Sequence, residues 1–365
     1  MIFIINLFIG KSKNKLKTTI CICTFRRNEL LKNLVNDLFS QSVKPNLILI
    51  VNGDKDNTEL EKVLNEKKNE NKDIKVINSN HANLPYQRFL GWKVAQAYQY
   101  EILIFMDDDL RLQNRYVLEN FLSEFLKQEN ISGATAKIFS IINDKLEINK
   151  FWGNKNKIIS QLGLSSKIKP GGITSYGNRV LPEFHKNNFA YVEWLQGRIM
   201  ALKKNSLDES DFSPDLFSMY EKKLGKAEDT YLSRQVLKTG KLIMINIEGF
   251  SHADDIEPAA YPTKPYHFGK AVAYSRRFLN DHYRINKPPR LKDRLDLLQT
   301  YAGNVFLNAL SVINKRDKAS VNYFIGYLYG SFLGIFKRPS TKNLTPHINW
   351  WQDAEDALKN QIIIE

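Results

Sequence analysis

Cysteine is scarce in this chain. Of 365 residues only Cys21 and Cys23 are cysteines, and they lie two positions apart in an apolar run. Alternate residues of a strand face the same side of a sheet, so these two side chains cannot bridge each other. The sequence thus excludes a disulfide scaffold and suits a reducing compartment, so we expect a cytoplasmic protein.

Two common phosphate-binding patterns and long apolar runs are also missing. None of the 18 glycines lies in a G-x-G-x-x-G or G-x-x-x-x-G-K pattern, which excludes the usual dinucleotide and P-loop cradles. The apolar runs at residues 1–10 and 323–336 are shorter than the ~20 residues that span a bilayer. The first run has no basic stretch before it and no small-residue cleavage site after it, so we do not expect a signal peptide. A packed element and an interfacial, membrane-touching one remain open for both runs.

Positive charge is in excess. The formal net charge is +14, and residues 264–294 hold nine lysines and arginines against two aspartates. This balance predicts a partner with negative charge, either phosphate groups or anionic lipid, although a solvated lysine-rich surface is the alternative. Arg276, Arg277 and Asn280 are candidates for contacts with phosphate or lipid head groups. We expect no nucleic acid polymer as a partner.

Short apolar runs alternate with segments of helical periodicity in the first third of the chain. This order predicts an α/β fold with a mostly parallel sheet flanked by helices. Ligands of such sheets bind beyond the carboxyl ends of the strands. The residues that follow three of the predicted strands are polar or acidic, at 24–27, 52–56 and 107–109. We predict strands at 19–24, 47–51, 74–77 and 101–106, and helices at 30–39, from about 57, and at 84–98.

The rest of the chain divides into two parts. Residues 151–188 are rich in glycine and lysine and predict mobile loops over the site, followed by two strands about Gln196 and Gly197 and a helix from about 228 to 238. Beyond residue 258 the pattern becomes helical and basic, with glycines at 326, 330 and 334 on one helix face. We expect an N-terminal segment at 1–16, an α/β domain at 17–255 and a mostly helical C-terminal extension at 256–365.

Asp107, Asp108 and Asp109 follow a buried strand directly. Three adjacent carboxylates repel one another, and a hard cation relieves that cost. Successive side chains alternate in direction, so Asp107 and Asp109 are expected to share one site while Asp108 points elsewhere. The pattern predicts Mg²⁺ or Mn²⁺ held by one or two carboxylates and by substrate phosphates. A solvated acidic turn before the next helix is the alternative.

Six short motifs in order resemble glycosyltransferase family 2. Each is weak alone, but their order is specific, and the resemblance covers about residues 17–252. It implies a GT-A fold and a nucleotide-sugar donor. The motifs are Thr24-Phe-Arg-Arg27, Asn52-Gly53, Arg88 with Gly91, the triple aspartate, Trp194-Leu-Gln-Gly197 and Glu228-Asp229.

The resemblance also implies roles for individual residues. Asp229 would be the catalytic base; the alternative is that it only complements the helix dipole. Valine at 51 stands where the family often has an acid, so nucleobase recognition is expected to shift to Asp54 or Asp56. The implied donor contacts are Thr24, Arg27, Asp54, Arg88, Asp107 and Asp108; the acceptor side is Trp194, Gly197 and Glu228; the metal ligands are Asp109, Asp107 and His252.

The function implied is an inverting, metal-dependent transfer of a sugar from a UDP, dTDP or GDP donor, the nucleotide being unresolved. The acceptor would be a glycan or a lipid-linked glycan, in cell-envelope polysaccharide synthesis, with possible peripheral contact at the anionic inner face of the membrane. Two alternatives stay open, a nucleotidyltransferase acting on sugar phosphates and a non-catalytic sugar- or lipid-binding scaffold. The first would favour a glycine- and lysine-rich loop near the first strand, which is missing here.

Overall fold

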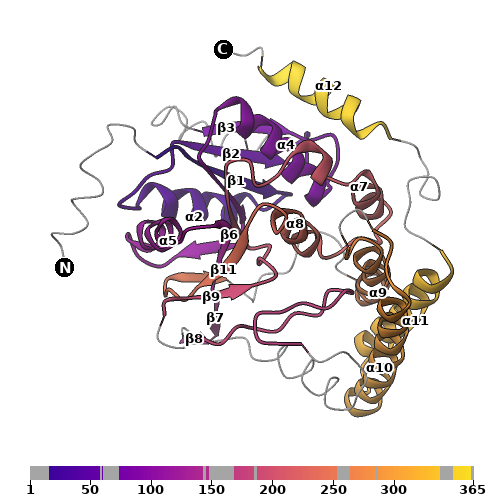
Figure 1. The fold of residues 1–365 in the computed structure, drawn as a ribbon. Helices are drawn as coiled ribbons and strands as arrows, with labels where there is room; N and C mark the ends of the chain where they lie inside the picture. The colour runs from indigo at the N-terminus through magenta and orange to yellow at the C-terminus, as the bar shows by residue number, and fades with distance from the viewer. Residues whose placement is uncertain are drawn as a thin grey trace.

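The computed structural model of the protein describes most of the chain (Figure 1). The described residues are 16–57, 60, 74–142, 145–147, 168–184, 187–252, 264–284, 287–337 and 348–362. The helix expected from about residue 57 and part of the loops expected at 151–188 lie outside them.

An eight-stranded, mostly parallel sheet forms the centre of the molecule. Its four first strands, β3, β2, β1 and β4, are neighbours and run parallel, which confirms the fold predicted from the alternating pattern. The antiparallel β10 then joins β4 to β6, and β11 runs parallel to β6. The strands in sheet order are β3 (Ile74–Asn78), β2 (Leu47–Asn52), β1 (Thr18–Thr24), β4 (Ile102–Asp107), β10 (Ile199–Lys203), β6 (Ile131–Ala136), β11 (Lys241–Ile245) and β9 (Phe189–Val192).

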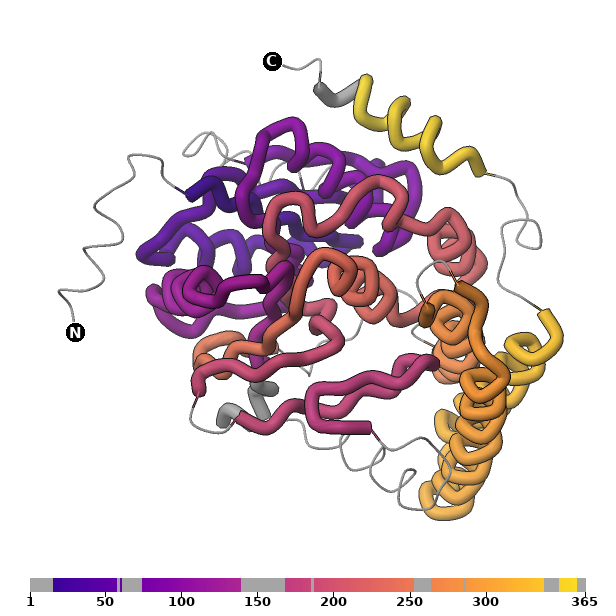
Figure 2. Tube along the Cα trace, in the orientation of Figure 1, coloured from indigo at the N-terminus to yellow at the C-terminus, as the bar shows by residue number. Residues whose placement is uncertain are grey.

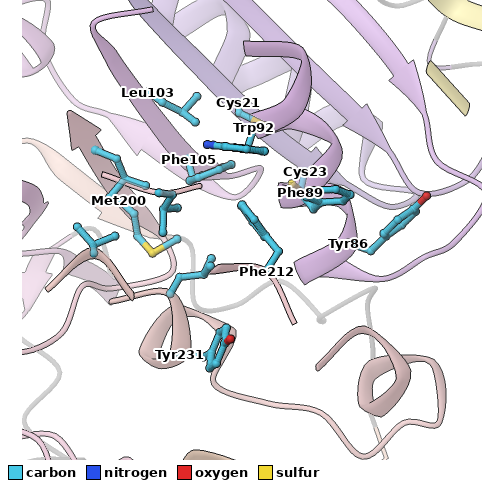
Figure 3. Packing of buried hydrophobic residues seen from close by; sticks show 14 of the residues in the cluster. Cys21, Cys23, Tyr86, Phe89, Trp92, Leu103, Phe105, Met200, Phe212 and Tyr231 are labelled. Atoms are coloured by element: carbon cyan, nitrogen blue, oxygen red, sulfur yellow. The ribbon is translucent and has the colours of Figure 1, made fainter. Parts of the chain in front are cut away.

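Helices cover both faces of this sheet because β1 is apolar on both. Ile20 and Ile22 belong to the core cluster beneath α2 (Asn28–Phe39) and α5 (Val117–Lys127). Cys21 and Cys23 belong to the opposite cluster, which contains Phe89 and Trp92 of α4 (Leu84–Ala97) (Figure 3). A β-carbon on Gly91 would lie 2.2 Å from Cys21 Sγ, so α4 packs unusually close to β1.

A second, four-stranded sheet brings a distant segment to the end of β4. It has the order β5 (Leu110–Leu112), β12 (Phe250–His252), β7 (Phe139–Ile142) and β8 (Lys145–Glu147). In the antiparallel pair of β5 and β12, His252 is opposite Leu110. This register places His252 beside the triple aspartate, which immediately precedes β5.

Helices dominate the described residues after His252, as expected. Three of them pack together: α9 (Pro265–Asp281), α10 (Leu291–Lys315) and α11 (Lys318–Phe336) (Figure 1). Glycines set the contact between α9 and α11, because a β-carbon on Gly326 would lie 2.0 Å from Tyr266 O and one on Gly330 would lie 2.3 Å from Lys270 O. Among the described helices none combines the length and apolarity needed to cross a membrane.

The helix α12 (Trp350–Ile362) returns to the N-terminal part of the chain, where it lies near α4 (Figure 2). Trp350 is buried in the same core cluster as Cys21 and Phe89. Asp353 accepts a hydrogen bond from Tyr86 O–H, and His81 lies with each ring nitrogen 3.6 Å from a carboxylate, of Glu221 and of Asp353. The C-terminal extension is therefore in contact with the α/β core at α9 and α12.

One local prediction needs correction. The two strands expected about Gln196 and Gly197 exist as β9 and β10, but β9 ends at Val192, before the expected end at Leu195. In the sheet β9 pairs with β11, and β10 pairs with β4 and β6. The turn at Gln196 is closed only by an isolated bridge to Ile199.

Candidate active site

The carboxyl ends of β1, β2 and β4 meet at one edge of the sheet, and a side chain from α4 ties two of them together. The Nε2 atom of Gln87 donates to Thr24 O across 3.1 Å and to Val51 O across 2.8 Å. Asn83 caps the helix by accepting from Tyr86 N, and Pro85 lies in the first turn. This start of α4 fixes both strand ends against it.

Asp108 is the most buried of the three aspartates, and its side chain contacts the turn after β1. Its Oδ2 atom accepts from Thr24 Oγ1 across 2.8 Å, and its Oδ1 atom accepts from Arg27 Nη1 across 2.9 Å. Burial raises the pKa of Asp108 to about 6, although Arg27 lowers it. Asp108 therefore positions Arg27 next to the other two aspartates.

Asp109 lies between Arg27 and His252. Its Oδ2 atom accepts from Arg27 Nη1 across 2.8 Å and lies 3.1 Å from His252 Nε2. Burial alone would raise the pKa of Asp109, but His252, Arg27 and Arg198 together lower it, so the carboxylate is held ionised. Its other oxygen, Oδ1, is buried and has no hydrogen-bond partner among the described residues.

Arg88 connects Asp107 to the helix that begins on the opposite side of the site. Its side chain is 1% exposed; Nη2 donates to Asp107 Oδ1 across 3.2 Å and to Gly197 O across 2.8 Å, and Nη1 donates to Glu228 Oε1 across 3.1 Å. Glu228 also accepts a hydrogen bond from Tyr220 O–H. Burial raises the pKa of Asp107 to about 7 although Arg88 opposes the shift.

Asp229 lies in the first turn of α8 (Glu228–Val236), and three donors fix its carboxylate. Oδ2 accepts from Arg179 Nη1 across 2.8 Å and from Gly197 N across 3.0 Å, and Oδ1 accepts from Thr230 N across 2.7 Å. A β-carbon on Gly197 would lie 3.4 Å from both Asp229 Oδ2 and Glu228 Oε1, so glycine allows this close approach. Burial would raise the pKa of Asp229, but Arg179 and Arg88 lower it.

These groups open into one pocket of about 960 Å³. Its far wall comes from α9, α10 and α11 and from the segment before β9. Within the described residues, no group of three or more His, Cys, Asp or Glu side chains is arranged to hold a metal by itself. The predicted site residues in its lining are Thr24, Arg27, Asp107, Asp108, Asp109, Gly197, Glu228 and Asp229.

Comparison with known proteins identifies a family domain in this chain. Residues 19–182 match the model of the family described as glycosyl transferase family 2. The chain carries a glycosyltransferase family 2 domain. The match begins in β1 and includes the triple aspartate. Two other parts of the site, Gly197 with α8 and His252 with β12, follow the matched residues in the chain. A search of curated proteins found no match to this sequence.

Several solved structures are similar to this chain. The mannosyltransferase PcManGT from Pyrobaculum calidifontis, in complex with GDP-Man and Mn²⁺, superposes with a TM-score of 0.52 at 10% identity, over 89% of this chain and 88% of that one. S. aureus TarS residues 1–349 reach a TM-score of 0.45 at 13% identity, over 87% and 91%. GalNAc-T7 with UDP, GalNAc and Mn²⁺ reaches 0.48 at 16%, over 80% and 55%. The likeness to PcManGT shows a GT-A-like fold.

Four predicted site residues of the glycosyltransferase domain lie outside the pocket lining. Arg88 contacts Asp107 and His252 contacts Asp109, but neither residue lines the pocket itself. Trp194 is buried, with Arg179 stacked over its ring at 5.0 Å. Asp54 is paired with Arg26 across 2.6 Å.

Sequence reasoning missed two residues of this glycosyltransferase site. Arg179 comes from a segment without periodicity, and an isolated bridge to Ile173 and the ion pair with Asp229 place it at the site. Tyr220 belongs to α7 (Pro214–Glu221), eight residues before the glutamate that it contacts. No local pattern marks either residue, because each is placed by tertiary packing.

Proposed function

We propose that this glycosyltransferase moves a sugar from a nucleotide-diphosphate donor to an acceptor hydroxyl with inversion at the anomeric carbon. One observation carries the proposal: Asp229 and the three aspartates after β4 face the same pocket, and Arg88 contacts a carboxylate on each side. Two separate carboxylate groups suit a single displacement, in which one side holds the leaving group and the other accepts a proton.

The residues around Asp109 fit a divalent cation, Mg²⁺ or Mn²⁺. The orphaned Oδ1 of Asp109, the neighbouring His252 and the adjacent Asp107 offer few protein ligands, as expected when substrate phosphates complete the coordination. Bound there, the ion would stabilise the negative charge of the departing diphosphate. The Mn²⁺ named with PcManGT is consistent with this proposal.

The donor half of the site would use the turn after β1. Thr24 and Asp108 hold Arg27 in place, and a guanidinium is suited to contact phosphate oxygens. Arg88 keeps Asp107 oriented. Asp54 and Asp56 at the end of β2 stay our candidates for the nucleobase, and Asp54 would have to leave Arg26 to make that contact.

Asp229 is the proposed base. Its ionised form is favoured by Arg179 and by the two backbone donors, so it is ready to accept the proton of the attacking hydroxyl. Glu228 is less suited because it already accepts from Arg88 and Tyr220. Glu193 is bound to Lys169 and Ile173 N and is not part of the pocket lining.

The acceptor half is basic, which supports an acceptor with a negative group beside its glycan. Lys223, Lys226 and Lys264 line the pocket, and none of them forms an ion pair with another described residue. His267 adds a ring nitrogen, Nδ1, that is buried without a described partner. A lipid-linked glycan with a phosphate meets this description, and we propose such an acceptor, in cell-envelope polysaccharide synthesis at the cytoplasmic side of the membrane.

A donor screen tests the proposed reaction. The purified protein is incubated with UDP-, dTDP- and GDP-sugars, with Mn²⁺ or with a chelator, and nucleoside diphosphate release is measured. We expect release from one class of donor that stops with the chelator. Absence of release from every donor, together with no Mn²⁺-dependent thermal shift by any nucleoside diphosphate, would overturn the proposal.

A further inference from the structure

The outer faces of α10 and α11 expose large apolar side chains along their whole length. On α10 these side chains recur at helical spacing, from Leu291, which is 76% exposed, to Ile313, which is 62% exposed. Exposed apolar patches of this extent are rare on the surface of soluble proteins and mark an interaction site. The set on α10 is Leu291, Leu295, Leu298, Phe306, Leu310 and Ile313.

The exposed face of α11 is separate from its packed face. Gly326, Gly330 and Tyr327 turn toward α9 and the core, whereas Phe332 and Phe336 are 56% and 69% exposed. The apolar residues on the outer side of α11 therefore stay partly exposed within the described chain. The exposed set on α11 is Val321, Ile325, Leu328, Tyr329, Phe332, Ile335 and Phe336.

Charge is confined to the two ends of these helices. No charged residue occurs at 297–314 or at 319–336. Because only Arg316 and Asp317 join the two helices, α10 and α11 run antiparallel and the ends of one meet the ends of the other. One end carries Lys287, Arg290, Lys292 and Lys337, and the other carries Lys315, Arg316 and Lys318.

Two of the three aspartates at these ends are used by the helices themselves. Asp293 accepts from Arg290 N, and Asp317 caps α11 by accepting from Ser320 N across 2.7 Å. The surface is thus an apolar strip with a basic patch at each end. This is the pattern of an element that lies in a bilayer interface, where basic residues meet anionic head groups.

We propose that the outer faces of α10 and α11, here called the interface face, bind the surface of an anionic bilayer without crossing it. Charge complementarity selects lipid over a second copy of the chain. Two copies joined face to face would bring basic ends against basic ends in either orientation. Anionic head groups instead neutralise both ends at once while the apolar strip enters the acyl boundary.

The interface face belongs to the same helices that form one wall of the pocket. Asn304 of α10 and Tyr323 of α11 line the pocket, as do Lys264, His267 and Phe268 at the start of α9. Docking on a bilayer therefore holds this wall close to the head-group layer. Given the proposed function, a lipid-linked acceptor then reaches the pocket without leaving the membrane.

Vesicle co-sedimentation tests the docking directly. We expect the full chain to sediment at low salt with phosphatidylcholine vesicles that contain phosphatidylglycerol, and less so at high salt. The double variant Leu295→Gln/Phe332→Gln should lose at least about tenfold in partitioning. Its matched control is Leu126→Gln/Tyr191→Gln, which removes two apolar side chains that are equally exposed but lie elsewhere and should bind as the parent does.

The role of the basic ends and the insertion of the apolar strip into the bilayer are tested with separate variants. Lys315→Gln/Arg316→Gln/Lys318→Gln should weaken binding to anionic vesicles about tenfold or more, whereas Lys44→Gln/Lys55→Gln/Lys204→Gln, on exposed lysines outside the face, should not. Both native cysteines are buried, so a Phe332→Cys variant can carry a polarity-sensitive dye. Its emission should shift to the blue with vesicles, and that of Leu126→Cys should not.

Three results would overturn the proposal. The apolar variant could sediment with vesicles as its parent does, or the emission of the dye at position 332 could stay unshifted. The parent could also form a dimer in sedimentation velocity that the apolar variant abolishes while that variant still binds vesicles. Donor hydrolysis by the same variants is measured in solution without lipid. Unchanged hydrolysis with lost vesicle binding supports docking, and docking by a chain that hydrolyses no donor would refute only the proposed reaction.

Discussion

Arg179 and Asp229 form an ion pair, with Arg179 Nη1 2.8 Å from Asp229 Oδ2. A cation from the segment before β9 thereby holds the proposed base, which lies on α8. Asp229 is 11% exposed, and burial alone would favour its protonated form. The pair with Arg179 keeps the carboxylate ionised and also fixes the direction in which Oδ2 faces the pocket.

Replacing the base should separate catalysis from donor binding. Asp229→Asn keeps the shape and most hydrogen bonds but cannot accept a proton. We expect near-normal donor affinity with transfer lowered by about 10²-fold or more. If Asp229 served only the helix dipole, the variant would lose well under ~1 kcal/mol of stability and keep its turnover. The measurement is the single-turnover transfer rate beside donor affinity by calorimetry.

Arg179 should control the acid limb of the pH profile. Because Arg179 lowers the pKa of Asp229, Arg179→Gln should raise that pKa, and the acid limb of kcat/KM should move to higher pH. A rate profile over the acid range measures the shift. Arg111→Gln, which removes a cation paired with Asp37 far from Asp229, is the control and should leave the limb unchanged. A limb that stays in place in both variants would contradict the role of the pair.

Asp109 should be needed for metal-dependent binding of the donor diphosphate. Asp109→Ala removes the orphaned oxygen and the partner of His252. We expect calorimetry to detect nucleoside diphosphate binding by the parent with Mn²⁺ and none by the variant. An affinity of the parent that is the same with a chelator as with Mn²⁺ would exclude the metal role.

Arg88 should stabilise the fold as well as the site. Arg88→Met leaves Glu228 and Asp107 without their cation, which is itself almost fully buried. Because breaking a buried pair costs about 3 to 5 kcal/mol, we expect the free energy of unfolding to fall by that amount. Urea denaturation measures the free energy of unfolding. The control is Lys93→Met on the same helix, whose pair with Glu209 is partly exposed and should contribute under ~1 kcal/mol.

The docking of α12 should depend on pH through His81. Burial lowers the pKa of His81, but Glu221 and Asp353 outweigh it and raise the pKa above the usual 6.5. Because the pKa of His81 is raised in the folded state, protonated His81 stabilises the fold below about pH 6.5. This stabilisation is lost as the pH rises through the pKa of His81 in the folded protein. The pKa of Glu221 is lowered from 4.5, chiefly by His81, so its contribution is lost as pH falls below that value.

Stability should therefore decline when the pH rises from the interval between 4.5 and 6.5 into the alkaline range. Thermal unfolding of the parent and of His81→Gln over this range checks the expectation, and the variant should show a flatter profile. His282→Gln on α9 serves as the control and should keep the parental slope. A slope that is equal in all three proteins would remove His81 from the pH response.

The sequence predicted β1 to β4 well because each of these strands is a short apolar run next to a segment of helical periodicity. Thr24, Arg27 and Asp107 to Asp109 were placed in one site by the rule that ligands bind at the carboxyl ends of parallel strands. His252 was found by resemblance, and its contact with Asp109 depends on pairing between β5 and β12. Such long-range pairing leaves no local pattern.

Other features could not be read from local patterns. The sequence indicated two strands about Gly197 but not their place in the sheet, where β6 and β11 lie between β10 and β9. Arg179 reaches Asp229 only because its segment folds back over α8. The outward direction of the apolar residues on α11 was also undecided, since the glycines that hold this helix to α9 and the aromatic residues that face away share one run of sequence.

The position of α12 gives the protein a built-in optical reporter. Trp350 and Trp351 are two of the five tryptophans in the chain; Trp350 is 2% exposed beside the His81 ring, and the Trp351 ring lies 4.7 Å from that of Phe89. Release of α12 alone would transfer both indoles to water and shift their emission to the red. A fluorescence change that precedes the loss of helical circular dichroism would thus time the departure of this helix from the folded core.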